Sequence, residues 1–358
     1  MHRFQKIQAA LADNGLDAIL LTEAANRFYA TDFASIGTDG LCLITRGSVY
    51  YFTDSRYTVA AQRHITDAQI TITDRNINYI DLVNRAVAAE GLKTIGFDDA
   101  YMTVADYNRY TAGVHAALRP ASVLMTQLRL VKDAVEIERL TQAQRIAERA
   151  LTEVLPQIRP GKTEREIASL LHYRMLMNGA DNVSFDPIVV AGDNGAMPHG
   201  VPGDRPIADG DFLTIDFGVL KDGYCSDMTR TYGIGHVTDE MRRVYDTVLR
   251  AQTTAIAATR AGKTGREIDA IARQIITDAG YGEYFGHGYG HGVGVEIHEA
   301  PTVSPRNDQP LPEGAVTSAE PGIYLPGKFG VRIEDVVVIT ADGCRNLAEM
   351  PKELTILG

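Results

Sequence analysis

The first hundred residues alternate between short apolar runs and amphipathic segments. Residues 1–15 have a helical period that ends at Gly15, and the strand-like runs LDAILL, LCLIT and VYYFTD follow. Helical patterns over 55–64 and 79–90 then alternate with the strand-like runs AQITITD and TIGFD. This alternation predicts an α/β domain. A long helical pattern begins in LRLVKDAVEIERL, and we place the boundary just before it, which gives domains 1–125 and 126–358.

The second domain contains an internal repeat. RPGKTEREI at 159–167 returns as RAGKTGREI at 260–268, with seven of nine residues identical at an offset of 101. Each copy has a threonine three residues before a glutamate, the pattern of a helix capping box: Thr163 with Glu166, and Thr264 with Glu267. GKT also suggests a phosphate loop, but Pro156 and Ala257 stand where that loop needs glycine. We therefore predict two similar halves with a site at their junction.

Each half also places two carboxylates in corresponding positions. Asp216 lies in the apolar strand FLTIDFG, and Asp227 lies on the returning strand. Glu320 ends a strand of the second half, and Glu334 lies within VRIEDVVVIT, at offsets of 104 and 107 from their counterparts. A buried acid is costly unless it is paired or binds metal, and four together repel one another. A single acid of this kind is more often salt-bridged, but the matched positions favour one or two divalent cations.

Three further polar residues lie near these acids. Arg332 and Thr229 each stand two residues from an acid, Glu334 and Asp227 respectively, and so share its face of the strand. Arg332 can hold a ligand carboxylate or form a structural salt bridge. Thr229 can hydrogen-bond to a ligand or be an ordinary strand threonine. His199 lies in the loop GDNGAMPHGVPGD, where an exposed surface histidine is the ordinary alternative to a functional one.

The segment GHGYGHGVGVEIHEAP at 286–301 concentrates glycine with three histidines: His287, His291 and His298. If 286–294 is extended, the glycines share one face and His287, Tyr289, His291 and Val293 share the other. Glycine allows close approach of a substrate. We expect one histidine to complete the metal set and another to contact the substrate. The sequence after His298 is EAPT, so a thermolysin-like HExxH zinc site is excluded.

Composition narrows the classes of function. The chain of 358 residues has a formal charge of −11, which argues against nucleic acid and membranes as partners. No apolar run reaches the length of a membrane span, and the N-terminal stretch carries Asp and Asn where a signal peptide is apolar. Three distant cysteines, Cys42, Cys225 and Cys344, form neither a disulfide framework nor a zinc finger. We expect a cytoplasmic protein.

With these residues in place, the sequence resembles the Xaa-Pro metallopeptidases, the aminopeptidase P and prolidase group. The motifs FDPIVVAGDNGAMPHG, YCSDMTRT, GHGVGVEIHEAP, EPGIYLPG and GVRIEDVVVIT occur in order and span the second domain. LDAILLT and YFTDSRY extend the likeness to the first domain. The resemblance implies an α/β creatinase-like N-terminal domain followed by a pseudo-twofold α+β pita-bread catalytic domain. Methionine aminopeptidases, which are related, generally lack the first of these.

The resemblance also implies the roles of the site residues. Two divalent metal ions would be held by five ligands: Asp216, Asp227, His291, Glu320 and Glu334. Mn²⁺ suits such a site best, and Co²⁺, Zn²⁺ or Fe²⁺ are alternatives. Glu320 would also be the general base, while His199 and His298 would contact the substrate and stabilise the tetrahedral intermediate. His287 would line the site, with Arg332 supporting the ligands.

The sequence departs from the family pattern in places. Some dipeptidases have arginine directly after HExP, whereas Thr302 follows Pro301 here. Arg306 is a candidate substrate-binding replacement, as is a residue of a partner subunit. Gly195 and Ala319 replace a common serine and valine without removing chemistry. Family members with this N-terminal domain usually form homodimers, and DFASIGTDG at 32–40 resembles the segment that reaches a partner's site.

We therefore expect metal-dependent hydrolysis of the bond between an N-terminal residue and a following proline in peptides. One alternative is a creatinase-like, metal-free hydrolase acting on a small guanidino compound. Another is a catalytically silent binding protein with the same fold. Relatives of both kinds have lost ligands, whereas all five are present here. The sequence leaves open whether dipeptides or longer peptides are the substrates.

Overall fold

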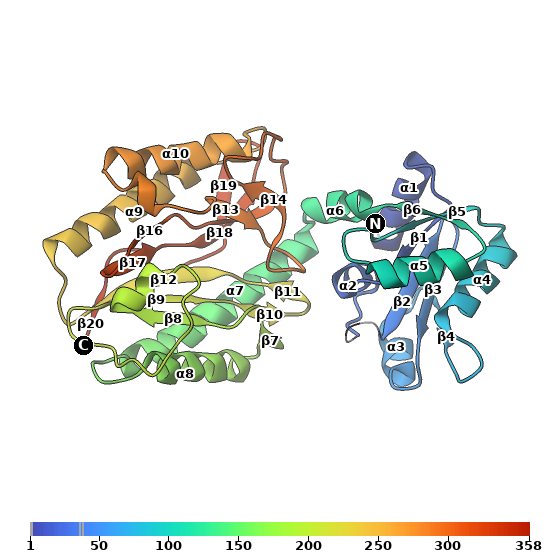
Figure 1. The fold of residues 1–358 in the computed structure, drawn as a ribbon, viewed down its shortest axis with the longest axis horizontal. Helices are drawn as coiled ribbons and strands as arrows, with labels where there is room; N and C mark the ends of the chain where they lie inside the picture. Colours follow the sequence, from blue (N-terminus) through green and yellow to red (C-terminus); the bar gives the residue numbers. More distant parts are fainter. Residues whose placement is uncertain (1–2, 36, 38) are drawn as a thin grey trace. The chain divides into compact units, whose positions relative to one another are not determined.

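The computed structural model describes residues 3–35, 37 and 39–358, and the chain divides into two units (Figure 1). The units are Met1–Arg129 and Leu130–Gly358. The boundary expected at 125/126 falls inside helix α6 (Ser122–Leu130), whose last turn contains the division. The loop at 32–40, which the sequence suggested for partner contact, includes residues 36 and 38, which lie outside the described residues.

The first unit is built on a mixed six-stranded sheet in the order β4-β3-β2-β1-β5-β6. Strand β1 pairs antiparallel with β2 and parallel with β5. Every residue of β1 and β2 is buried, as in central strands covered on both faces. The strands are β1 (Ala18–Leu21), β2 (Gly40–Thr45), β3 (Val49–Thr53), β4 (Gln69–Ile72), β5 (Thr94–Phe97) and β6 (Ala117–Pro120). The helices are α1 (Arg3–Asp13), α2 (Ala24–Thr31), α3 (Thr58–His64), α4 (Tyr79–Glu90) and α5 (Val104–Gly113).

The second unit repeats one arrangement twice. Each half contributes a helix pair, and the two pairs lie on opposite sides of the strands (Figure 1). The pairs are α7 (Ala134–Val154) with α8 (Glu164–Met177), and α9 (Asp239–Ala258) with α10 (Gly265–Asp278). The predicted capping boxes are confirmed, because the hydroxyls of Thr163 and Thr264 each accept a backbone N–H bond of 3.1 Å from the glutamate three residues on. The GKT triplets therefore begin helices.

Each half has its own sheet and its own hydrophobic core. The first-half sheet has the order β20-β12-β9-β8, with a smaller sheet β11-β10-β7, and its core includes Val189, Leu213 and Ile167. The second-half sheet has the order β14-β13-β15-β18-β19, with a hairpin β16-β17, and its core includes Ile268 and Val331. The two sheets with their cores therefore lie side by side in one unit, and the strands of the two halves meet where a site can form.

The first-half strands are β7 (Asn182–Val183), β8 (Ile188–Ala191), β9 (Phe212–Phe217), β10 (Val219–Lys221), β11 (Tyr224–Cys225) and β12 (Met228–Ile234). The later strands are β13 (Gly290–Gly292), β14 (Glu299–Val303), β15 (Val316–Ala319), β16 (Gly322–Leu325), β17 (Phe329–Arg332), β18 (Asp335–Ile339), β19 (Cys344–Asn346) and β20 (Ile356–Leu357). Short 3₁₀ turns occupy Leu155–Gln157, Gly192–Ala196 and Gly282–Tyr284. Within the described ranges, no helix is both long enough and apolar enough to cross a membrane.

Candidate metal centre

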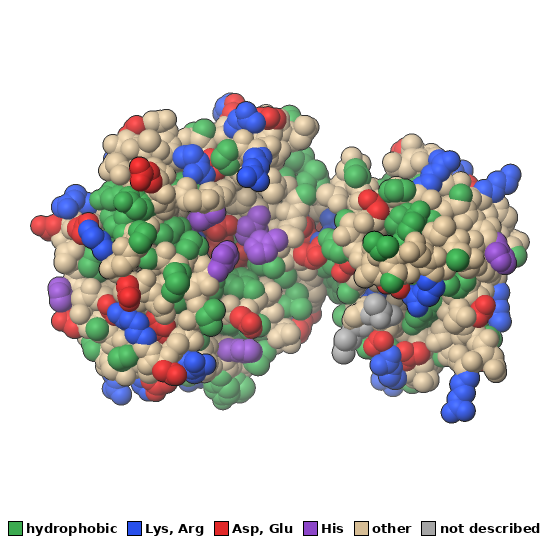
Figure 2. All heavy atoms as spheres, in the orientation of Figure 1, with side chains coloured by type: hydrophobic (Ala, Val, Ile, Leu, Met, Phe, Trp, Pro, Cys, Tyr) green, Lys and Arg blue, Asp and Glu red, His purple; other side chains and the backbone are tan. Residues whose placement is uncertain are grey.

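A cavity of about 840 Å³ in the second unit collects most of the predicted site residues. Figure 2 shows histidine side chains gathered beside acidic ones in a hollow of this unit. The predicted residues that line the cavity are His199, Asp216, Asp227, His287, His291, His298, Glu320, Arg332 and Glu334. Thr229 is fully buried behind this lining, and Arg306 is exposed outside it. Residues from both halves therefore converge on one cavity.

The four acids occupy corresponding places in the two halves. Asp216 lies in β9 and Asp227 immediately precedes β12, which pairs antiparallel with β9. Glu320 follows β15, and Glu334 immediately precedes β18, which pairs antiparallel with β15. The expectation that Glu334 lies within one continuous strand is corrected. The strand breaks there because the backbone N–H of Glu334 does not bond within its own sheet. It donates a hydrogen bond of 3.1 Å to the carbonyl of Thr229 in the first half.

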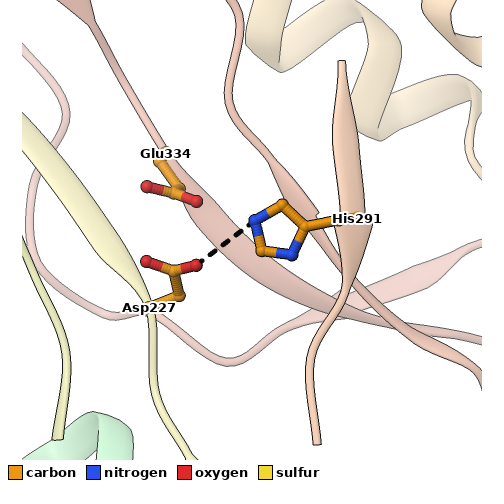
Figure 3. Close-up of side chains that lie close together, drawn as sticks. All are labelled: Asp227, His291 and Glu334. Carbon is orange, nitrogen blue, oxygen red and sulfur yellow. Dashed lines mark ion pairs between the residues drawn. The ribbon is translucent and has the colours of Figure 1, made fainter. Parts of the chain in front are cut away.

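Asp227, His291 and Glu334 form the tightest cluster (Figure 3). One ligand atom of each lies within 4.8 Å of the others. Nε2 of His291 is 3.5 Å from Oδ2 of Asp227 and 3.2 Å from Oε1 of Glu320. Ser318 fixes this geometry, because its hydroxyl donates to Glu320 (3.0 Å) and accepts the backbone N–H of His291 (3.0 Å). The sequence analysis missed Ser318, although it lies in β15 only two residues before Glu320.

The electrostatics of the cluster are those of a crowded cation site. Burial, followed by repulsion from neighbouring carboxylates, raises the pKa values of Asp227 and Glu334 well above the ordinary range. Burial also raises the pKa of Asp216, against the opposing effect of Arg332. His291 behaves in the opposite way: although burial opposes its charge, the contacts with Glu320 and Asp227 raise its pKa to about 9. Three adjacent carboxyls that resist ionisation together suit a divalent cation.

Arg332 and Thr229 each bond to an acid of the opposite half. Nη2 of Arg332 donates to Oδ2 of Asp216 at 2.5 Å, and Nε donates to the hydroxyl of Thr229 at 3.1 Å. The Thr229 hydroxyl in turn donates to Oε2 of Glu334 at 2.6 Å. The sequence had paired each residue with the acid two positions away on its own strand. The partners are exchanged because the strands of the two halves meet at the site.

Tyr324 is a cavity residue that the sequence analysis missed. Its buried hydroxyl accepts a hydrogen bond from Nη1 of Arg332 at 2.9 Å and lies 2.9 Å from Nε2 of His287. It therefore connects a histidine of the cavity wall to the arginine that holds Asp216. The sequence could have indicated this residue, because Tyr324 lies four residues after Glu320 within the motif EPGIYLPG.

The expectation of one shared face for His287, Tyr289, His291 and Val293 is wrong. The segment is a strand only over Gly290–Gly292, and bends before it turn Tyr289 into the core, where its hydroxyl donates to the Gln252 carbonyl at 3.1 Å. Val293 is also fully buried. Only the histidines line the cavity, and the rings of His291 and His298 meet edge to face at 4.3 Å. Burial lowers the pKa values of His287 and His298.

Arg306 is not brought to the site. Its side chain is exposed, whereas Thr302 and Ser304 line the cavity in its place. The chain from Thr302 to Ser304 passes the cavity wall along β14 and leaves it before residue 306. Proximity in sequence to His298 was therefore a poor guide to the position of this arginine.

A duplicated catalytic unit, with acids of both halves around one histidine, defines a metal-dependent hydrolase with a separate N-terminal domain. Residues 138–341 match the family model of metallopeptidase family M24, and residues 3–131 match that of the creatinase/prolidase N-terminal domain. The chain belongs to metallopeptidase family M24, and it has the expected combination of a creatinase-type first domain and a pita-bread catalytic domain.

Similar proteins cover the full length of the chain. An Xaa-Pro dipeptidase from Pyrococcus horikoshii is 34% identical over 354 residues, 98% of each chain. Among solved structures, an Xaa-Pro dipeptidase from Bacillus anthracis aligns with a TM-score of 0.94 and 40% identity over 99% of each chain. An X-Pro aminopeptidase from Thermotoga maritima aligns with a TM-score of 0.93 and 39% identity over 100% of each chain.

Proposed function

We propose that this metallopeptidase removes the N-terminal residue from peptides whose second residue is proline. Two divalent metal ions, with Mn²⁺ as the first candidate, would be held by Asp216, Asp227, His291, Glu320 and Glu334. The observation that carries the proposal is the convergence of these donors from both halves on one cavity. Oδ1 of Asp216 supports it further, because this buried oxygen has no hydrogen-bond partner in the described structure and belongs to a residue that lines the same cavity.

The side chains around the cluster suit peptide hydrolysis. When bound, divalent cations supply Lewis acidity, which lowers the pKa of water and polarises a carbonyl group. Glu320 would accept a proton from the attacking water and pass it to the departing proline nitrogen. His199 and His298, both exposed to the cavity, would donate hydrogen bonds to the carbonyl oxygen as negative charge develops there. Arg332 and Thr229 would hold Asp216 and Glu334 in position.

The wall of the cavity favours substrates longer than a dipeptide. A dipeptidase benefits from a cation that binds the terminal carboxylate of its short substrate. Among the described residues that line the cavity, Arg332 is the only lysine or arginine, and Asp216, Thr229 and Tyr324 already engage its guanidinium. A dipeptidase activity, which the names of two relatives favour, would need a cation from elsewhere. A partner subunit of a homodimer is the expected source.

The first test compares an Xaa-Pro dipeptide with an Xaa-Pro-Yaa tripeptide, with Mn²⁺ and after chelation. We expect metal-dependent release of the first residue, faster from the tripeptide. Preference for the dipeptide would instead indicate a carboxylate-binding group supplied in trans, and the mass of the active species in solution would then be measured. Cleavage of neither peptide by metal-loaded protein would refute the proline specificity. Hydrolysis of a small guanidino compound after chelation would support the creatinase-like alternative.

A further inference from the structure

A buried ion pair lies just behind the cavity wall. Nζ of Lys132 is 2.6 Å from Oε1 of Glu299, and the two side chains are only 1% and 7% exposed. Lys132 precedes helix α7, and its backbone N–H donates to the Gly314 carbonyl at 2.9 Å. Glu299 is the first residue of β14 and directly follows His298. The pair therefore connects the start of the catalytic unit to the segment that carries a cavity histidine.

The carboxylate of Glu299 clamps the hairpin loop between β13 and β14. It accepts the backbone N–H of Glu296 at 3.3 Å and lies directly over Gly294, where an added Cβ would stand only 2.2 Å from Oε1. The carbonyl of Gly294 accepts the backbone N–H of Cys225 at 2.8 Å, which ties the loop to the strand before Asp227. The loop is therefore fixed at both ends, with Ile297 and His298 directed into the cavity.

We propose that Lys132 and Glu299 are positioning residues for the peptidase reaction. Their ion pair holds the loop at 294–298 so that the ring of His298 stays against His291 and can reach the substrate carbonyl. This inference rests on the proposed function for the role of His298. The geometry of the pair stands independently of it. Neither residue touches the cavity, so their effect passes through the loop.

The charges of the pair matter because both side chains are almost completely buried. A buried carboxylate that loses its partner is strongly destabilised and moves toward water. Such a movement of Glu299 would release Gly294 and Glu296 and displace His298, its neighbour in the chain. A displacement on the order of 1 Å at a group that stabilises a transition state lowers the rate about a hundredfold. We expect the loss in kcat, with KM nearly unchanged.

The test compares Lys132→Met with Lys328→Met in the full chain. The control removes a lysine from a pair of nearly the same length, Lys328 with Glu240 at 2.7 Å, which is exposed in the same unit. Two quantities are measured: kcat and KM on an Xaa-Pro-Yaa peptide with Mn²⁺, and the histidine ring NMR signals of the metal-free protein. His298→Gln assigns the His298 signal, and exposed His236 serves as the reference.

We expect Lys132→Met to lower kcat about ten- to a hundredfold and to shift or split the His298 signal, while Lys328→Met changes neither. Unchanged kcat and an unchanged His298 signal in folded Lys132→Met would overturn the inference. The ring signals require neither metal nor substrate, so they test the positioning even if the wild-type protein cleaves no proline peptide.

A double variant separates positioning from stability. Lys132→Met with Glu299→Gln leaves no unpaired buried charge, so it is expected to fold even if the single variant does not. Its thermal midpoint should return toward the wild-type value while kcat stays low, because methionine cannot hold the amide over Gly294. Recovery of kcat together with the midpoint would show a purely structural pair and would refute the proposal.

Discussion

Asp227→Asn should stabilise the metal-free protein and destabilise the metal-loaded protein. Asp227 is 3% exposed, and one of its oxygens lies within 4.8 Å of an oxygen of Glu334. Without a cation the two carboxylates repel each other, so removal of one charge increases the stability of the folded protein. With a cation both carboxylates would be ligands, so the same change would remove a bond to the metal. The sign of the effect should therefore reverse with metal.

The magnitude follows from the separation of the charges. Two unit charges within 4.8 Å of each other repel by at least about 3.5 kcal/mol at an effective dielectric of ~20. Protonation and the nearby His291 relieve part of this, so we expect Asp227→Asn to add about 1–2 kcal/mol without metal. For a unit of this size that raises the thermal midpoint by roughly 2–8 °C. Mn²⁺ at a thousandfold excess over Kd should add about 4 kcal/mol, or roughly 8–16 °C, to the wild-type protein only.

Thermal unfolding with chelator and with Mn²⁺ at pH 8 measures both effects. Asp246→Asn is the control, because it removes an exposed aspartate from α9 in the same unit. A lower midpoint of metal-free Asp227→Asn than of wild type would refute the argument from repulsion. A full Mn²⁺-induced shift in the variant would refute its role as a ligand.

Three further substitutions test other parts of the structure. Asp98→Asn should stabilise the first unit more at pH 8 than at pH 5. Burial raises the pKa of this fully buried carboxyl to about 7 from an ordinary 3.8, so the wild-type protein loses stability as pH rises from about 4 to 7, whereas the variant with the amide does not. Urea unfolding at both pH values measures the difference. Thr264→Ala should cost about 1 kcal/mol of unfolding free energy by removing the cap of α10, while Thr264→Ser should cost much less. Tyr324→Phe should lower kcat/KM about tenfold, because Arg332 and His287 each lose a hydrogen-bond partner worth about 1–2 kcal/mol. An unchanged kcat/KM would show that the connection through Tyr324 does not affect catalysis.

The duplication and the acids were predictable because they are periodic in the sequence. The repeat at an offset of 101 located two capped helices, and nearly equal offsets located the acids. Short elements without such a signal were missed. Helix α2, for example, has only eight residues, and the side chain of Glu23 caps it in place of a standard capping residue.

Contacts across the junction of the halves were not predictable. The sequence indicated that Arg332 and Thr229 face the site, but their partners depend on how β12 and β17 meet, which no local pattern encodes. The pair of Lys132 and Glu299 joins residues 167 positions apart for the same reason. The prediction for Arg306 was wrong for the opposite reason. This residue is close to His298 in the sequence, but the fold does not bring it into the cavity.

The two halves have matching helices but different acids, and this difference makes the two sides of the site unequal. The first half supplies the shorter side chains of Asp216 and Asp227, and the second supplies the longer side chains of Glu320 and Glu334. The cluster of Asp227, His291 and Glu334 is therefore not symmetric, because its histidine comes from the second half only. A strictly symmetric cleft would accept a peptide equally well in either orientation. In this cleft the longer side chains of one half and the single imidazole of the cluster remove that symmetry, as an enzyme that acts at one end of a peptide requires.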